Sequence, residues 1–72
     1  MTEQKLNKFN IRLKELREEK NMTRQALADE LHISVRLVGY WENGQRECSL
    51  DMLIKLAKLL DTDVNYLIGY SD

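Results

Sequence analysis

The sequence contains no proline, and glycine occurs only at Gly39, Gly44 and Gly69. With so few residues that interrupt regular structure, we expect helices joined by tight polar turns. Cysteine and histidine occur once each. A single cysteine cannot form an internal disulfide, so the fold does not depend on an oxidising compartment. A metal site needs several converging ligands, so we expect no metal, and we expect no cofactor.

Long apolar runs are also absent. No segment approaches the roughly 20 residues needed to cross a membrane, and the polar N-terminus lacks the apolar core of a secretory signal. We therefore expect a cytoplasmic protein with no membrane partner. The chain, residues 1–72, has room for one domain that buries about 60% of its unfolded surface. Neither a deep cleft nor a set of acid, base and nucleophile is indicated, so we expect no enzyme.

Basic residues are not in surplus, because 11 Lys and Arg face 12 Asp and Glu, for a net charge of −1. This balance counts against a nucleic-acid partner, since neutralising phosphates drives much of the affinity of such proteins. The acidic surplus lies after residue 48, where it can occupy a face turned away from a nucleic acid. Four earlier acidic residues lower the expected affinity: Glu18, Glu19, Asp29 and Glu30.

Hydrophobic periodicity predicts an all-α domain of five short helices. Phe9, Leu13 and Leu16 recur as on one face of a helix, which indicates a helix over 8–20. Residues suited to N-capping then precede four further helices, predicted over 24–31, 34–43, 50–60 and 64–68. These caps are Thr23, Ser34, Ser49 and Asp63. Asn21 and Gly69 suit the left-handed backbone that ends a helix.

The same periodicity predicts which side chains point inward. Val38 and Trp41 face the core in the third helix, and Leu27, Ala28 and Leu31 do so in the second. The fourth helix carries two apolar stripes. We expect its inner face to hold Leu50, Leu53, Ala57 and Leu60, and its other stripe to hold Met52, Leu56 and Leu59.

The most informative segment is 23–44, which reads as two short helices joined by a brief turn. So tight a connection makes the helices cross steeply and projects the second one outward. An α-helix fits the major groove of DNA, where each base pair presents its own pattern of donors and acceptors. The outward side chains of the helix 34–43 decide whether this geometry is used.

Residues 9–69 resemble the lambda-repressor-like helix-turn-helix domains of the Cro/repressor type, also described as XRE-like. The resemblance rests on a combination of motifs: "LR" ending the first helix, "T…LA" in the second, "IS" and "WENG" around the third, and "SL…L.KLA" in the fourth. It implies a transcription regulator that binds double-stranded operator DNA sequence-specifically, most simply as a dimeric repressor. The alternative is a protein-interaction module on the same scaffold, such as an antitoxin subunit, which the pI of about 5.8 slightly favours.

The resemblance also implies roles for single residues. Base contacts fall on the third helix, and phosphate contacts fall on the start of the second helix and on the loop after the third. Arg17 with Glu42 matches an ion pair between the first and third helices. Gly39 departs from the family's pattern inside the reading helix, and we expect its missing side chain to let the helix backbone approach DNA. The residues predicted to contact DNA are Arg24, Ser34, Val35, Arg36, Gly39, Tyr40, Asn43, Gln45 and Arg46.

Several of these residues have a simpler interpretation. Arg36 either contacts guanine or is a solvated surface arginine, and Val35 either meets a thymine methyl or is an ordinary exposed valine. Tyr40 either bonds DNA through its hydroxyl or packs against the loop at Gln45.

His32 stands where the family usually has glycine, at a position that tends to need a positive φ.

The C-terminal third holds more apolar side chains than so small a core needs. We expect the surplus to form a homodimer interface, which would place two reading helices about 34 Å apart on DNA. The alternative is that the last helix folds back and buries these side chains. The predicted interface residues are Leu59, Val64, Tyr66, Leu67, Ile68 and Tyr70.

Overall fold

The structure, a computed structural model, describes residues 7–69. It contains five α-helices and no strand within that range, which confirms the predicted all-α fold. The helices are α1 (Phe9–Glu19), α2 (Arg24–Leu31), α3 (Val35–Glu42), α4 (Leu50–Leu59) and α5 (Val64–Ile68).

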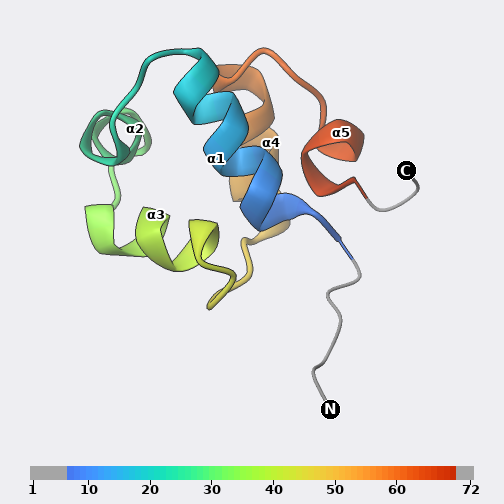
Figure 1. The fold of residues 1–72 in the computed structure, drawn as a ribbon, viewed down its shortest axis with the longest axis horizontal. Helices are drawn as coiled ribbons and strands as arrows, with labels where there is room; N and C mark the ends of the chain where they lie inside the picture. The colour runs from blue at the N-terminus through green and yellow to red at the C-terminus, as the bar shows by residue number, and fades with distance from the viewer. Residues whose placement is uncertain (1–6, 70–72) are drawn as a thin grey trace.

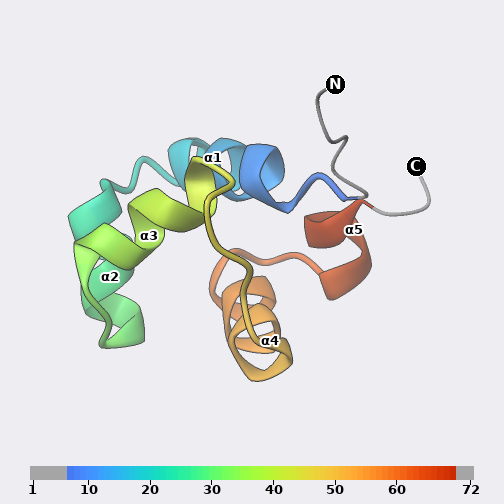
Figure 2. The same cartoon turned by 90° about the horizontal axis from the view of Figure 1, so that it is seen from below.

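Helix α1 spans the middle of the molecule (Figure 1). Helices α2 and α3 pack together on one side of it, and α5 lies on the other side. Helix α4 lies behind α1 in Figure 1, and the view in Figure 2 shows that the loop following α3 leads to it. The pair α2–α3 therefore forms one end of the domain, and α4 and α5 lie away from it.

Side-chain caps start four of the helices as predicted. Thr23 accepts a hydrogen bond from the Ala26 amide at 3.0 Å, and Ser34 accepts one from the Leu37 amide at 3.2 Å. Ser49 and Asp63 cap α4 and α5 in the same way, at 3.2 and 2.7 Å. Each cap satisfies an amide that has no partner within its helix, which defines where the helix begins.

Left-handed residues end the helices. Asn21, His32 and Gly69 have φ of 56°, 58° and 64°, as expected, and Asp61 joins them at 56°. Gly69 is the residue for which this conformation matters most, because a Cβ there would stand 3.1 Å from the Lys8 Cβ. A side chain at this position would meet both a strained backbone and a crowded neighbour.

The core is apolar and draws on every helix. Leu13, Leu27, Val38, Leu56 and Leu67 are completely buried. Trp41 is also buried, as predicted, and contacts the ring of Phe9 edge-on with centroids 6.2 Å apart. None of the helices within residues 7–69 is long and apolar enough to cross a membrane.

The predicted inner face of α4 is partly wrong. Ala57 and Leu60 are buried, but Leu50 is 66% exposed, and Leu56, assigned to the other stripe, is fully buried. Both stripes repeat with helical spacing, so periodicity alone does not choose between them. The way α4 docks decides the matter, because it turns the face centred on Leu56 and Leu60 toward the core and leaves the first residue of the helix outside.

Candidate nucleic-acid interface

The segment 23–44 forms the predicted pair of helices joined by a tight turn. The turn is built around His32, whose left-handed backbone ends α2, and the Ile33 amide donates to the Ala28 carbonyl at 3.0 Å. Ser34 then caps α3 immediately, so only three residues separate the two helices. This confirms both the boundaries of the unit and the positive φ expected at His32.

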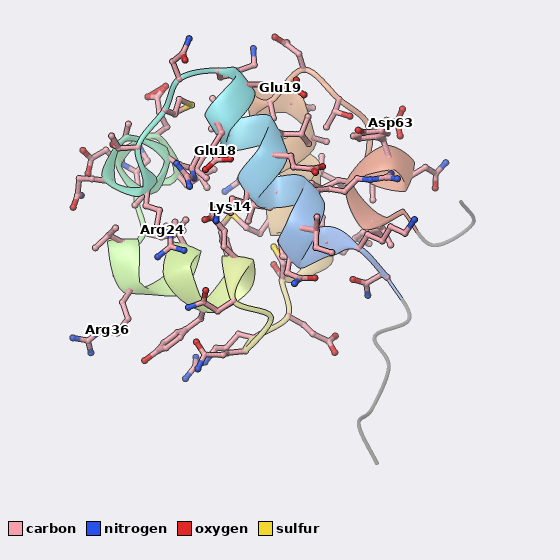
Figure 3. All side chains as sticks on the ribbon, in the orientation of Figure 1. Lys14, Glu18, Glu19, Arg24, Arg36 and Asp63 are labelled. Carbon is pink, nitrogen blue, oxygen red and sulfur yellow. The ribbon has the colours of Figure 1, made fainter. Side chains whose placement is uncertain are left out.

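Helix α3 has two distinct faces. Val38, Trp41 and Glu42 are buried, whereas Arg36 is exposed and Val35 is 40% exposed. In Figure 3 the side chain of Arg36 projects away from the body of the protein. Asn43, the C-cap of α3, is also exposed. The outward face predicted from helical spacing is therefore open within the described part of the chain.

Glu42 anchors the inner side of α3 through its buried carboxylate. Arg17 donates from Nε to Glu42 Oε2 at 2.7 Å and from Nη2 to Oε1 at 3.2 Å. The third nitrogen of Arg17, Nη1, donates to the Met22 carbonyl at 2.7 Å. The hydrogen bond to Glu42 raises the pKa of Arg17 above its ordinary value. The ion pair that the resemblance implied is thus present, and it connects α1 to α3.

Arg24 joins the same carboxylate, which sequence reasoning did not anticipate. Its Nε donates to Glu42 Oε1 at 3.0 Å from the first turn of α2. Glu42 therefore receives guanidinium groups from two helices. A signal was available, since an arginine stands where the family usually has glutamine, but the partner could be identified only once α2 and α3 were placed.

The loop after α3 brings Tyr40 and Arg46 together. The Arg46 guanidinium lies over the Tyr40 ring, 5.1 Å from its centroid, and the Gln45 amide donates to the Tyr40 carbonyl at 2.8 Å. Tyr40 is half-buried, while Gln45 and Arg46 are exposed. The tyrosine thus contacts the loop through Arg46, which places a cation at the edge of the outward face, and its bond to DNA stays a prediction.

The remaining predicted contact residues lie at the same end of the molecule. Ser34 is exposed, and its Oγ already accepts the capping hydrogen bond, which leaves its hydroxyl proton to donate elsewhere. Gly39 lies on α3 beside Arg24, with the position of a Cβ 3.5 Å from Arg24 Nη1. Asp63, one of the late acidic residues, caps α5 at the opposite end of the domain (Figure 3).

The predicted dimer residues divide into two groups. Leu67 is fully buried inside its own chain, where it completes the core, so its assignment to a dimer interface is wrong. Tyr66 is 45% exposed, and three others are half-buried: Leu59, Val64 and Ile68. Tyr70 lies outside the described residues.

Tyr66 is held in place by α1. The Arg12 guanidinium lies 4.2 Å from the centroid of the Tyr66 ring, and Arg12 Nη1 donates to the Tyr66 carbonyl at 2.7 Å. The Lys8 amide donates to the Ile68 carbonyl at 2.6 Å. These contacts fix α5 against the start of α1, so any partner at Tyr66 would meet both helices.

Groups that could support other chemistry are few. Within residues 7–69, no three His, Cys, Asp or Glu side chains come together as a metal site would require. Burial raises the pKa of the Cys48 thiol to about 11. The thiol therefore stays protonated at neutral pH, where a thiolate would be the reactive form.

The chain belongs to the helix-turn-helix family, whose model matches residues 13–67. The resemblance to lambda-repressor-like domains is thereby confirmed. One curated relative is the HTH-type transcriptional regulator AnsR of Bacillus subtilis (strain 168), 43% identical over 58 residues that cover 81% of this chain and 50% of AnsR. The chain spans about half or less of the length of the curated relatives it matches.

Solved structures share the arrangement of helices. The restriction-modification controller protein C.AhdI from Aeromonas hydrophila matches with a TM-score of 0.77 and 40% identity, over 88% of this chain and 96% of that one. ComR from S. thermophilus, solved in complex with DNA and its signalling peptide ComS, matches with a TM-score of 0.77 and 30% identity. That match covers 90% of this chain and 22% of ComR.

Proposed function

We propose that this chain is a DNA-binding transcription regulator that reads its operator by inserting α3 into the major groove. The observation that carries the proposal is the open outward face of α3, with Arg36 and Val35 exposed beside a buried face that holds the helix in place. The side chains predicted to read bases therefore lie on a helix whose orientation is constrained by Glu42. Similarity to AnsR, a transcriptional regulator, and to ComR, solved with DNA, supports the proposal.

The contacts divide into two kinds. Arg36 is assigned to a guanine edge and Val35 to a thymine methyl, and these contacts would specify sequence. Arg24 and Arg46 are assigned to phosphates, together with backbone amides of the loop at Asn43 and Gln45, and these would set the position of the protein on DNA. With a net charge of −1, this local cluster of arginines has to supply the attraction that the whole molecule lacks.

We further propose that the regulator acts as a homodimer that represses by occupying a promoter, with Tyr66 at the centre of the interface. Two copies related by a two-fold axis would place their α3 helices in successive major grooves about 34 Å apart. The interface would use exposed and half-buried side chains of α4 and α5. A location in the cytoplasm, where DNA is accessible in bacteria such as those of the relatives, belongs to the same proposal.

Selection of bound duplexes from a random pool tests the proposal, followed by binding measurements on Arg36→Ala. We expect a near-palindromic site, and we expect the variant to lose about 1–3 kcal/mol of discrimination at one base pair per half-site. The fold should remain intact by circular dichroism, since Arg36 makes no contact with the core. Equal weakening on every sequence would mean that Arg36 touches only phosphate.

The alternative, a protein-interaction module on the same scaffold, makes the opposite prediction. Such a module would enrich no duplex from the pool, and any residual DNA affinity would be independent of sequence. A DNA reader should instead lose affinity steeply as salt rises, because counterions are released from each neutralised phosphate.

A further inference from the structure

Gly39 and Arg24 face each other across the junction of α2 and α3. The position of a Cβ on Gly39 lies 3.5 Å from Arg24 Nη1, which is ordinary van der Waals contact. Figure 3 shows the Arg24 side chain reaching from α2 toward α3. A methyl group would therefore fit beside the Arg24 guanidinium, whereas a side chain longer than that of alanine would compete with it for the same space.

Glu42 fixes the inner end of the Arg24 guanidinium. The carboxylate of Glu42 is completely buried, whereas the Arg24 side chain is 40% exposed. Because Glu42 is held from the other side by Arg17, its carboxylate cannot follow Arg24 outward. Arg24 is thus tied at Nε, and within residues 7–69 its two terminal nitrogens make no hydrogen bond.

These terminal nitrogens lie next to the surface that carries Arg36. Residues three and four apart on a helix are neighbours, so Gly39 lies beside both Arg36 and Val35 on α3. Arg36 extends away from the helix, whereas Arg24 stays close to it (Figure 3). The longer reach of Arg36 suits a base edge within the groove, and the short, fixed reach of Arg24 suits the backbone at the groove wall. A guanidinium also presents paired N–H donors that match phosphate oxygens.

We propose that Gly39 is a positioning residue that acts through Arg24. A residue no larger than alanine at this position leaves room for Arg24 to lie between α2 and α3 with Nε on Glu42, and this placement directs the terminal N–H groups at a DNA phosphate. The proposal rests on the proposed function.

A double-mutant cycle tests the coupling between residues 24 and 39. The four proteins are the wild type, Gly39→Leu, Arg24→Ala and the combined variant, and Gly39→Ala is the matched control. Leucine is a strong helix former that adds bulk without a charge or hydrogen-bond donor. The dissociation constant is measured by fluorescence anisotropy on the duplex selected by the wild type, at several salt concentrations, after circular dichroism has verified each fold.

We expect Gly39→Leu and Arg24→Ala to weaken binding by the same factor. Each should make the slope of log affinity against log salt shallower by about 0.9, as for one lost phosphate contact. The combined variant should bind no more weakly than Arg24→Ala alone, because residue 39 then has no guanidinium to displace. Gly39→Ala should bind like the wild type, since its methyl group fits at 3.5 Å.

Three results would overturn the inference. The first is that Gly39→Leu leaves affinity and salt slope unchanged. The second is that it weakens binding equally with and without Arg24, which would place residue 39 itself against DNA. The third is a wild type that selects no duplex, which would leave Arg24 without a DNA phosphate to bind and would reject the proposed function as well. This result is obtained before any variant is made, so the two failures can be told apart. If Gly39→Leu does not fold, Gly39→Met takes its place in the cycle under the same criteria, since methionine also adds bulk without a hydrogen-bond donor.

Discussion

Glu42 illustrates how a single buried residue can organise this interface. Its carboxylate accepts hydrogen bonds from Arg17 on α1 and Arg24 on α2, so one side chain of α3 is connected to both neighbouring helices. A buried charge is tolerated only when it is paired and hydrogen-bonded. Here each carboxylate oxygen has at least one guanidinium donor, and the orientation of α3 depends on that pairing.

At the scale of single residues, we predict that Glu42→Ala destabilises the domain by about 3–5 kcal/mol, because it leaves the buried guanidinium of Arg17 without its carboxylate partner. Urea unfolding followed by circular dichroism measures the loss. Glu47→Ala is the matched control, since Glu47 is exposed and its removal should change stability by less than about 0.5 kcal/mol. Equal stabilities for the two variants would contradict a structural role for the ion pairs.

At the scale of single helices, local signals explain most boundaries. A capping side chain at Thr23, Ser34 and Ser49 marks the start of α2, α3 and α4, and left-handed residues such as His32 mark ends. These signals act over three or four residues, so they can be read without knowing the fold. The side of α4 that faces inward is different, because two apolar stripes were available and the docking of the helix selected one.

At the scale of single helices, the prediction concerns Ser49, which caps α4. Ser49→Ala should cost about 1 kcal/mol by leaving the Met52 amide without its acceptor, which corresponds to a fall in Tm of about 4–8 °C for a domain of this size. Ser49→Asp is the control, since aspartate caps as well as serine and its charge suits the helix N-terminus. Differential scanning calorimetry distinguishes the two, and equal Tm values would show that α4 does not need the cap.

At the scale of the whole molecule, the domain separates two surfaces. The α2–α3 end carries Arg24 and Arg36, with Arg46 in the loop that follows α3, while Tyr66 belongs to α5 on the opposite side of α1. A dimer formed at Tyr66 would therefore leave the arginine-bearing end uncovered. This arrangement is compatible with binding a second copy and DNA at the same time.

The proposed dimer is tested by Tyr66→Asp. A charge in the centre of the interface should convert the dimer to a monomer in sedimentation equilibrium, while the fold persists because Arg12 can pair with the new carboxylate. Asn65→Asp, the same charge one residue away, is the control and should stay dimeric. Leu67→Asp should instead unfold the chain, since it buries a charge in the core. A wild type that is already monomeric at high concentration would end the dimer proposal.

The sequence by itself determined the helices, their caps, the turn at His32 and the outward phase of Arg36, because these depend on interactions between residues close in the chain. Only the tertiary structure decided which stripe of α4 is buried, that Leu67 belongs to the core, and that Arg24 meets Glu42 and Gly39. Each of these depends on how one helix packs against another, and helical periodicity describes a face without saying what will cover it.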